Sequence, residues 1–183
     1  MRIVAGTFRS RIIEPVPGND TRPTADKIKE SVFNRIGPYF DGGRVLDLFG
    51  GSGNIGFEAL SRGMEEVVFA DHSRIAVKTI EKNARTLGVL DHCKILAMDY
   101  QKALAALQGE MFDLIYLDPP YKQKQLDHIL EYLCTHNMIA EHGLVVCECL
   151  PDEELKEAYA SLTKRNDVLL GITRIAIYER NSL

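Results

Sequence analysis

The sequence predicts an α/β protein built on a mostly parallel sheet. Short apolar runs alternate with helical segments from Gly43 onward, and this alternation is typical of parallel strands joined by helices. A glycine-rich turn at residues 50–53 separates the first of these apolar runs from the helical segment that follows it. At 183 residues, 45% of them hydrophobic, the chain can form one globular domain with a sizeable core.

The charge of the chain is unevenly distributed. The net charge is −4, yet residues 1–35 carry seven Lys and Arg against four Asp and Glu, and residues 161–183 carry four against two. Residues 36–160 therefore hold a net charge of −9. The basic ends predict either one positive face that meets a phosphate backbone or ordinary solvated charge, and both interpretations remain open at this point.

Composition also bounds the location and the metal content that we expect. The chain contains no apolar run of 18 residues and no apolar N-terminal segment. We therefore expect neither a membrane span nor a signal peptide, and we expect the protein to be cytoplasmic. The five histidines fall in no ligand spacing and the cysteines form no C-x-x-C pair, so we expect no metal. Small buried thiols are the favoured interpretation of Cys93, Cys134, Cys147 and Cys149.

The N-terminal region reads as a small extension. Two β-like pieces, residues 2–6 and 11–13, predict a hairpin that carries Arg2, Arg9 and Arg11. Proline and glycine at residues 15–18 then break the pattern. A helix is expected from Ala25 to Ile36 with Thr24 as its N-cap, which divides the chain into an extension, residues 1–24, and a main domain, residues 25–183.

The first regular unit is a strand, a glycine loop and a helix. Residues 44–49 form an apolar strand, and the loop leads into a helix that runs through Leu60. Gly51, Gly53 and Gly56 satisfy G-x-G-x-x-G, which a nicotinamide enzyme uses to bring a pyrophosphate against a helix N-terminus. Taken alone, that pattern has little specificity.

Two further strands end in acids. The strand at residues 66–70 is followed by Asp71, which in a Rossmann-like arrangement accepts hydrogen bonds from ribose hydroxyls. The alternative is an acid at the N-terminus of the predicted helix Arg74 to Leu87. The strand at residues 94–98 is followed by Asp99, which could accept from an adenine amine or cap a helix.

The most specific motif is Asp118-Pro119-Pro120-Tyr121, directly after the buried strand predicted at residues 112–117. The prolines lack N–H groups and hold the preceding carbonyls stiffly. The Asp118 carboxylate and the Pro119 carbonyl can each accept one hydrogen of a planar NH2 group, and Tyr121 offers a face for stacking. An exocyclic amine of a nucleobase fits this set, although a strand stop and helix cap is the simpler alternative.

The remaining segments complete the predicted sheet. We expect a helix containing residues 126–133, a strand at 144–149, a helix at about 152–162, and two strands around 168–170 and 172–178. The last two leave no room for a helix between them and predict an antiparallel hairpin. A mostly parallel seven-stranded sheet with a reversed last strand follows, whereas a nicotinamide domain would continue with βα units.

Several motifs together resemble the RsmD-like family of 16S ribosomal RNA guanine-N2 methyltransferases, and the match runs essentially from end to end. Asp118-Pro119-Pro120-Tyr121 resembles the motif of amino-methyltransferases, and the other segments that carry the resemblance are Met1-Arg2-Ile3-Val4-Ala5-Gly6, Thr21-Arg22-Pro23-Thr24 and Leu46-Asp47-Leu48-Phe49-Gly50-Gly51-Ser52-Gly53. The family often has Ala where Gly50 stands and Glu where Asp71 stands. The resemblance implies a Rossmann-like, class I S-adenosylmethionine-dependent methyltransferase fold.

The resemblance also implies roles for individual residues. Catalysis falls to Asp118, Pro119, Pro120 and Tyr121. S-adenosyl-L-methionine is contacted by Asp47, Phe49, Gly50, Gly51, Ser52, Gly53, Asp71 and Asp99. RNA is contacted by the N-terminal extension, through Arg2, Arg9, Arg11 and Arg22. The implied partner is ribosomal RNA, within a small-subunit assembly particle, with no membrane and no metal.

The expected reaction is an in-line methyl transfer to guanine N2, in which Asp118 and the Pro119 carbonyl orient the amine and Asp118 receives the proton. The base must leave its helix to reach the cofactor. The acceptor pair does not distinguish guanine from other amines, so an amino-methyltransferase acting on another RNA, DNA or a small molecule is the main alternative. A noncatalytic RNA-binding assembly factor and a nicotinamide oxidoreductase are the others.

Overall fold

The structure is a computed structural model that describes residues 1–18, 23–120 and 125–182. The chain divides into two compact units, Met1–Ala105 and Ala106–Leu183, and each unit is described by itself. The division of the sequence into an extension at residues 1–24 and a domain at 25–183 stays a prediction.

Unit 1 contains a parallel three-stranded arrangement. Its strands are β1 (Arg44–Asp47), β2 (Glu66–Asp71) and β3 (Cys93–Ala97), in the order β3-β2-β1. Both strand pairs are parallel, with Val45 opposite Val67 and Phe69 opposite Ile95. The predicted strands are confirmed with bounds shifted by one or two residues. Because the strands are parallel, their carboxyl ends meet at one edge, where open α/β sheets bind ligands.

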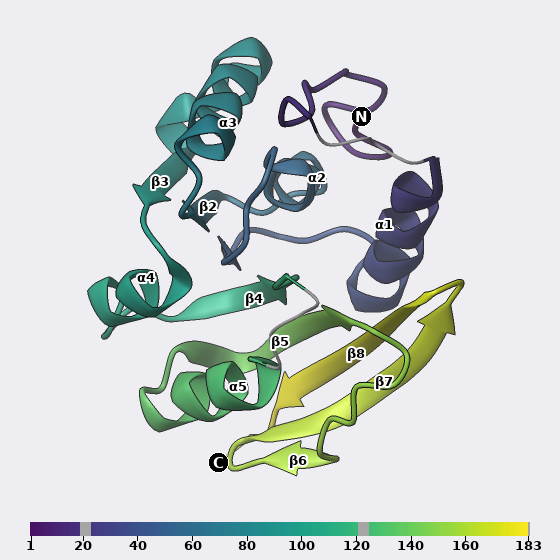
Figure 1. Cartoon of the computed structure of the whole chain (residues 1–183), viewed down its shortest axis with the longest axis vertical. Coiled ribbons are helices and arrows are strands. Elements are labelled where there is room, and N and C mark those ends of the chain that lie inside the picture. Colours follow the sequence, from purple (N-terminus) through teal and green to yellow (C-terminus); the bar gives the residue numbers. More distant parts are fainter. Residues whose placement is uncertain (19–22, 121–124, 183) are drawn as a thin grey trace. The chain divides into compact units, whose positions relative to one another are not determined.

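Unit 1 also contains helices (Figure 1). They are α1 (Pro23–Ile36), α2 (Asn54–Ser61), α3 (Arg74–Leu87), the short 3-10 helix η1 (Leu90–His92) and α4 (Tyr100–Ala106). Of these, α2 connects β1 to β2, and α3 with η1 connects β2 to β3. The first helix, α1, begins two residues earlier than predicted, so Thr24 lies inside it and the predicted cap position is wrong. The last, α4, was not predicted. On α3, Ser73 is the N-cap and its hydroxyl accepts from Ala76 N, while Gly88 with φ +72° closes the C-terminus.

The N-terminal residues form a looser structure than a regular hairpin. Arg2 and Ile12 make an isolated antiparallel bridge, supported by Ile3 N donating to Arg11 O and Ile13 N donating to Met1 O, each at 3.0 Å. Ile3 and Ile13 are completely buried. The two β-like pieces therefore do pair, as predicted, although over too few residues to count as strands.

Within residues 106–120 and 125–182, unit 2 contains a mixed sheet and the helix α5 (Leu126–Thr135). Its strand order is β4-β5-β8-β7-β6, with β4 parallel to β5 and all later pairs antiparallel. The bounds are β4 (Phe112–Leu117), β5 (Ile139–Cys149), β6 (Ala158–Tyr159), β7 (Leu162–Leu170) and β8 (Thr173–Arg180). The predicted antiparallel final hairpin around Gly171 is confirmed. Cys147 and Cys149 are buried on β5, as expected of packing thiols.

The helix predicted at about residues 152–162 is wrong. The described chain has turns there, followed by β6, an additional two-residue strand. Tyrosine hydroxyls use the backbone groups that a helix would need: Lys156 N donates to the Tyr159 hydroxyl at 3.1 Å, and the Tyr178 hydroxyl donates to Lys156 O at 2.7 Å. These tertiary hydrogen bonds satisfy the backbone in another conformation and outweigh the helical preference of a Glu- and Ala-rich stretch.

Among the helices in the described ranges, none combines the length and the apolar character that crossing a membrane requires.

Candidate active site

The loop between β1 and α2 has a backbone shape that requires glycine. Gly50 N donates to Ala70 O at 2.9 Å on the neighbouring strand, and Gly53 N donates to Gly50 O at 2.8 Å. Gly51 and Gly53 have φ of +57° and +84°, in the left-handed region. A Cβ on Gly50 would stand 2.9 Å from Ile80 Cδ1. The loop is therefore held tightly against β2 and α3.

The open side of this loop is at Gly51. A Cβ added there would meet nothing within 4 Å, whereas one on Gly56 would stand 2.3 Å from Phe69 Cε1. The two glycines thus act differently: Gly56 lets α2 pack closely on β2, and Gly51 leaves room for a ligand to approach the backbone. The role of Gly56 is the one that the G-x-G-x-x-G pattern assigns to its last glycine.

Asp71, at the end of β2, connects the glycine loop to the start of α3. Its Oδ2 accepts from Gly51 N at 2.9 Å and its Oδ1 accepts from Ser73 N at 2.8 Å. Ser73 is the N-cap of α3, so Asp71 also lies at the N-terminus of that helix, as the alternative interpretation expected, and its contact with ribose stays a prediction. Each carboxylate oxygen can accept more than one hydrogen bond, which leaves acceptor capacity for a hydroxyl pair.

Asp47, at the end of β1, lies beneath the same loop. It is 2% exposed, and its Oδ2 accepts from Gly56 N at 3.2 Å. Burial raises the pKa of Asp47 from an ordinary 3.8 to about 7; the Gly56 N–H opposes this rise, and the nearby Asp71 charge adds to it. The carboxyl group of Asp47 therefore links the end of β1 to the first turn of α2, directly after the glycine loop.

Asp99 and Phe49 lie close to the same edge. Asp99 is half-exposed and accepts from Lys102 N at 3.0 Å through Oδ1, which caps α4 and lowers the pKa of Asp99. The capping alternative considered for Asp99 is thus present, and a contact with adenine stays a prediction. Phe49 packs against Tyr100, with ring centroids 5.6 Å apart. Sequence reasoning missed Tyr100, although an aromatic residue directly after the strand-ending acid was a usable signal.

In unit 2, β4 ends at Leu117 and leads directly into the Asp118-Pro119-Pro120 segment. Asp118 and Pro120 are exposed while Pro119 is buried. Tyr121 lies outside the described residues. The exposed carboxylate therefore follows a strand whose interior is buried, as the sequence indicated.

A second carboxyl group, which the sequence did not suggest, lies near the end of β4 in unit 2. The buried Tyr116 hydroxyl donates to Glu148 Oε2 at 2.8 Å, and Glu148 is on the neighbouring strand β5. Burial raises the pKa of Glu148, and the Tyr116 hydrogen bond opposes this rise. Its position on a strand within a buried apolar run was the only signal for it.

The predicted RNA-contacting arginines belong to the N-terminal segment. Arg2, Arg9 and Arg11 are exposed, and Arg2 pairs with Asp26 at 3.9 Å. Arg11 donates from Nη2 to Thr86 O at 2.7 Å, at the C-terminal end of α3. Arg22 lies outside the described residues.

Sequence analysis also missed the residues that attach this segment to the cofactor loop region. Glu58 on α2 is completely buried and accepts from Val4 N and Ala5 N. Lys29 donates to Asn54 Oδ1 at 2.7 Å, at the first residue of α2. Asn83 donates to Ser52 O at 3.0 Å. From sequence alone, charged residues in helices are expected to face solvent, so only the fold reveals that these are buried.

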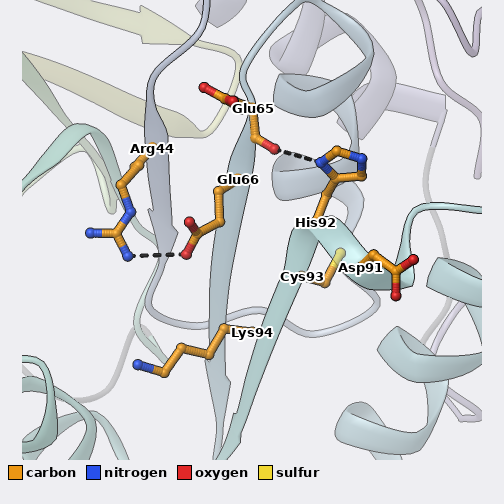
Figure 2. Close-up of a pocket in the computed structure, with 7 residues that line it drawn as sticks. All are labelled: Arg44, Glu65, Glu66, Asp91, His92, Cys93 and Lys94. Atoms are coloured by element: carbon orange, nitrogen blue, oxygen red, sulfur yellow. Dashed lines mark hydrogen bonds and ion pairs between the residues drawn. The ribbon is translucent and has the colours of Figure 1, made fainter.

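A separate hollow of about 520 Å³ lies at the amino ends of β1, β2 and β3 (Figure 2). The Arg44 guanidinium reaches Glu66 at 3.0 Å on its wall, and His92 Nδ1 lies 2.9 Å from Glu65 O. Its lining also includes Asp91, Cys93 and Lys94. This hollow opens at the strand ends opposite to Asp47 and Asp71, and its mixed charges point to no single ligand.

The residues at the carboxyl edge of unit 1 fit a nucleoside cofactor. The unobstructed backbone at Gly51 and the remaining acceptor capacity of Asp71 suit a ribose. The Phe49 and Tyr100 rings supply apolar surface beside Asp99. Nothing in this set of donors and acceptors conflicts with S-adenosylmethionine.

Comparison with known proteins agrees with this arrangement. The family model described as Conserved hypothetical protein 95 matches residues 1–179. YlbH of Bacillus subtilis, named as a provisional rRNA methyltransferase, is 43% identical over 98% of this chain and 99% of its own. Ribosomal RNA small subunit methyltransferase D of Haemophilus influenzae is 31% identical over 98% of this chain and 93% of its own.

Solved structures give the same result. A structure described as yhhF of Escherichia coli, a provisional methyltransferase, has a TM-score of 0.86 at 27% identity and covers 100% of this chain and 99% of its own. A conserved hypothetical protein from Streptococcus pyogenes has a TM-score of 0.80 at 36% identity, over 84% and 95%. The fold is that of class I methyltransferases, and the chain belongs to the Conserved hypothetical protein 95 family, the RsmD-like family of S-adenosylmethionine-dependent methyltransferases.

Proposed function

We propose that the protein transfers a methyl group from S-adenosylmethionine to the N2 amine of a guanine in small-subunit (16S) ribosomal RNA. The observation that carries this proposal is the exposed Asp118 carboxylate followed by two prolines, directly after the buried strand β4. Membership of the RsmD-like family supports it, because the Haemophilus influenzae relative is named for methylation of small-subunit ribosomal RNA.

The cofactor is assigned to the loop after β1 and to the acids after β2 and β3. Asp71 would accept from the ribose hydroxyls, Asp99 from the adenine amine, and Phe49 would pack on the purine. The backbone of the loop would lie close to the cofactor at Gly50, Gly51, Ser52 and Gly53, and Asp47 would support this arrangement. When bound, S-adenosylmethionine supplies a methyl group made electrophilic by its sulfonium.

The substrate amine is assigned to Asp118 and to the carbonyl of Pro119. Guanine N2 is a poor nucleophile because its lone pair is delocalised into the ring. If the carboxylate and the carbonyl accept its two hydrogens, the nitrogen can become pyramidal and its lone pair is directed away from the ring, an effect of orientation and electrostatics. Asp118 then holds the proton that the amine loses. Tyr121 would stack on the extruded base.

RNA binding is assigned to Arg2, Arg9, Arg11 and Arg22, through contacts with phosphates. We infer that the substrate is a small-subunit assembly particle and not free RNA. The exposure of Arg2, Arg9 and Arg11 supports a contact with a polyanion.

The experiment is transfer of labelled methyl from S-adenosylmethionine to ribosomal RNA, on free 16S RNA and on partly assembled small subunits, followed by digestion to nucleosides. The expected product is N2-methylguanosine, formed on the particle. Asp118→Asn keeps the size of the side chain but replaces one acceptor oxygen by a donor, so we expect turnover to fall by at least about 100-fold. Cofactor affinity should stay within about twofold, because no cofactor contact is assigned to Asp118.

Each outcome tests a different part of the proposal. Label in another nucleoside would keep the enzyme and overturn guanine N2. Label on free RNA at the same rate as on the particle would overturn the assembled substrate. An Asp118→Asn variant with full turnover would overturn the catalytic assignment. An absence of label on both RNAs, with S-adenosylmethionine bound, would overturn ribosomal RNA as substrate.

A further inference from the structure

We propose that the outward face of α3 continues the RNA-binding surface of the N-terminal segment and binds the phosphate backbone of the substrate. This rests on the proposed function only in that the substrate is RNA. The face consists of Arg74, Lys78, Lys82 and Arg85, which are named below as the α3 stripe.

Most of the positively charged residues of the chain lie in unit 1. Residues 1–105 carry 15 Lys and Arg against 13 Asp and Glu, whereas residues 106–183 carry seven against 13. The basic residues near the C-terminus are also engaged with acids: Arg174 binds both carboxylate oxygens of Asp167, at 2.8 and 2.7 Å. Lys164 pairs with Glu157 and Asp167, and Arg165 pairs with Glu179. Of the two basic ends of the sequence, the C-terminal one is thus largely neutralised.

The α3 stripe lies along one side of its helix. Its four members are all exposed, and their spacing of four, four and three residues places them within about 80° of arc. The opposite side is apolar and buried, through Ala76, Val77, Ile80, Ala84 and Leu87. Because that side is packed in unit 1, the cationic side has a single orientation, toward solvent.

Most of the positive charge on the stripe is uncompensated. Lys82 pairs with Glu14 at 2.8 Å. In the described ranges, no ion pair within 4.0 Å involves Arg74, Lys78 or Arg85, and Glu81 is the only acid of α3. Three cations therefore remain over roughly 16 Å of helix, since each residue adds about 1.5 Å.

The stripe is continuous with the N-terminal segment. Asn83 lies between Lys82 and Arg85 in sequence and is 1% exposed. Its side chain donates to Glu14 O at 2.9 Å and accepts from Glu14 N at 2.8 Å. Arg11 donates to Thr86 O at 2.7 Å, one residue beyond Arg85. These hydrogen bonds hold the segment against α3, so Arg11 and the stripe form one preformed surface.

The chemistry of this surface selects a linear polyanion as the partner. Charges that repeat at about 6 Å along a helix can neutralise successive phosphates, and each neutralised phosphate releases counterions. A protein partner would require a central apolar patch, yet Ile75 is the only large apolar side chain on α3 that is markedly exposed. The stripe also begins three residues after Asp71, so RNA bound there approaches the glycine loop to which Asp71 is hydrogen bonded.

The test is equilibrium binding of a fluorescently labelled 16S RNA transcript as a function of salt. The variant is Lys78→Ala/Arg85→Ala, which removes two unpaired cations from the solvent side of the helix and leaves its buried side intact. The matched control is Lys94→Ala, an exposed lysine of the same unit at the amino end of β3. Thermal unfolding of all three proteins verifies that they are folded.

We expect the double variant to bind RNA on the order of tenfold more weakly at about 50 mM salt. The slope of log affinity against log salt should lose about 1.4, because each phosphate contact on a single strand contributes about 0.7. S-adenosylmethionine affinity should not change, and Lys94→Ala should bind RNA like the unaltered protein.

Two results would overturn the proposal: an unchanged salt slope in the double variant, or a loss in Lys94→Ala that is as large per removed charge, which would make the effect one of total charge. Neither affects the proposed function, which is tested separately by the nucleoside that receives label. If the unaltered protein binds the transcript no better than serum albumin does, the stripe is rejected as a binding surface for RNA, and the substrate is decided by the methyl-transfer experiment on the particle.

Discussion

Lys29 Nζ lies 3.1 Å from Glu58 Oε2, and both side chains are buried, with exposures of 1% and 0%. Glu58 also accepts from Arg62 Nε at 2.9 Å and from two backbone N–H groups of the N-terminal segment, those of Val4 and Ala5. Burial lowers the pKa of Lys29, and the attraction of Glu58 opposes this. One carboxylate on α2 thus joins the N-terminal segment, α1 and α2.

Replacing this carboxylate should destabilise the protein strongly. Glu58→Gln removes the buried negative charge that Lys29 and Arg62 share, and Lys29 keeps only the longer ion pair with Asp26 at 3.8 Å. We therefore expect a loss of about 3 to 5 kcal/mol in unfolding free energy. Urea denaturation measures it. Hydrogen exchange at Val4 and Ala5 should accelerate, because their amides lose a charged acceptor.

The matched control is an exposed pair of similar length. Lys156 Nζ lies 2.8 Å from Glu131 Oε1, and both side chains are more than half exposed. Glu131→Gln should cost much less, since water screens this pair. Equal losses in the two variants would contradict the importance of burial at Glu58.

Asp47 should make stability depend on pH. Its pKa rises from an ordinary 3.8 to about 7 on folding because of burial, so the folded protein holds this proton more tightly than the unfolded chain does. The resulting stability is present below about pH 4 and is lost as the pH rises through about 7, by about 1 kcal/mol per pH unit. Asp47→Asn removes this contribution.

The measurement for Asp47 is urea denaturation of both proteins without cofactor, at a series of pH values. The difference in unfolding free energy between Asp47→Asn and the unaltered protein should change between about pH 5 and pH 7 and level off above that. Parallel curves over this range would show that Asp47 does not titrate there.

Asp71→Asn should lower the affinity for the cofactor more strongly than it lowers the free energy of unfolding. The two carboxylate oxygens of Asp71 serve different backbone donors, Gly51 N and Ser73 N, and an amide can accept through only one of its two polar atoms. We expect S-adenosylhomocysteine affinity, measured by calorimetry, to fall at least about tenfold. Asp99→Asn is the comparison, since Asp99 is half-exposed and caps α4; a larger loss there would reverse the assigned order of importance.

Gly56→Ala should separate α2 from β2. The added Cβ would stand 2.3 Å from Phe69 Cε1 and 2.7 Å from Val67 Cγ2, both in the buried core. We expect a loss of about 2 to 3 kcal/mol in unfolding free energy, as for overpacking. Gly88 also has a positive φ, +72°, but a Cβ added there would meet nothing within 4 Å. Gly88→Ala should therefore cost only about 1 kcal/mol of backbone strain. Equal costs would mean that conformation, and not the close approach, explains Gly56.

Local patterns predicted the glycine loop and the strands beside it well. The apolar runs, the glycine turn and the strand-ending acids Asp47 and Asp71 depend on periodicity and on turn chemistry, which act over a few residues. The helix expected at about 152–162 failed for the opposite reason. Its residues have helical preferences, but Lys156 N donates to the Tyr159 hydroxyl and Lys156 O accepts from the Tyr178 hydroxyl, and Tyr178 is 22 positions away along the chain.

The sequence by itself therefore determined most of the strands, the glycine loop and the motif at Asp118, because each depends on neighbours in the chain. Only the tertiary structure decided that Glu58 and Lys29 are buried, that Asn83 supports Ser52, and that Arg174 is neutralised while Arg85 remains without an ion pair in the described ranges. The physical reason is that the energy of a charge depends on its solvent exposure and on the charges around it. Both follow from segments that are distant in sequence and adjacent in the folded chain.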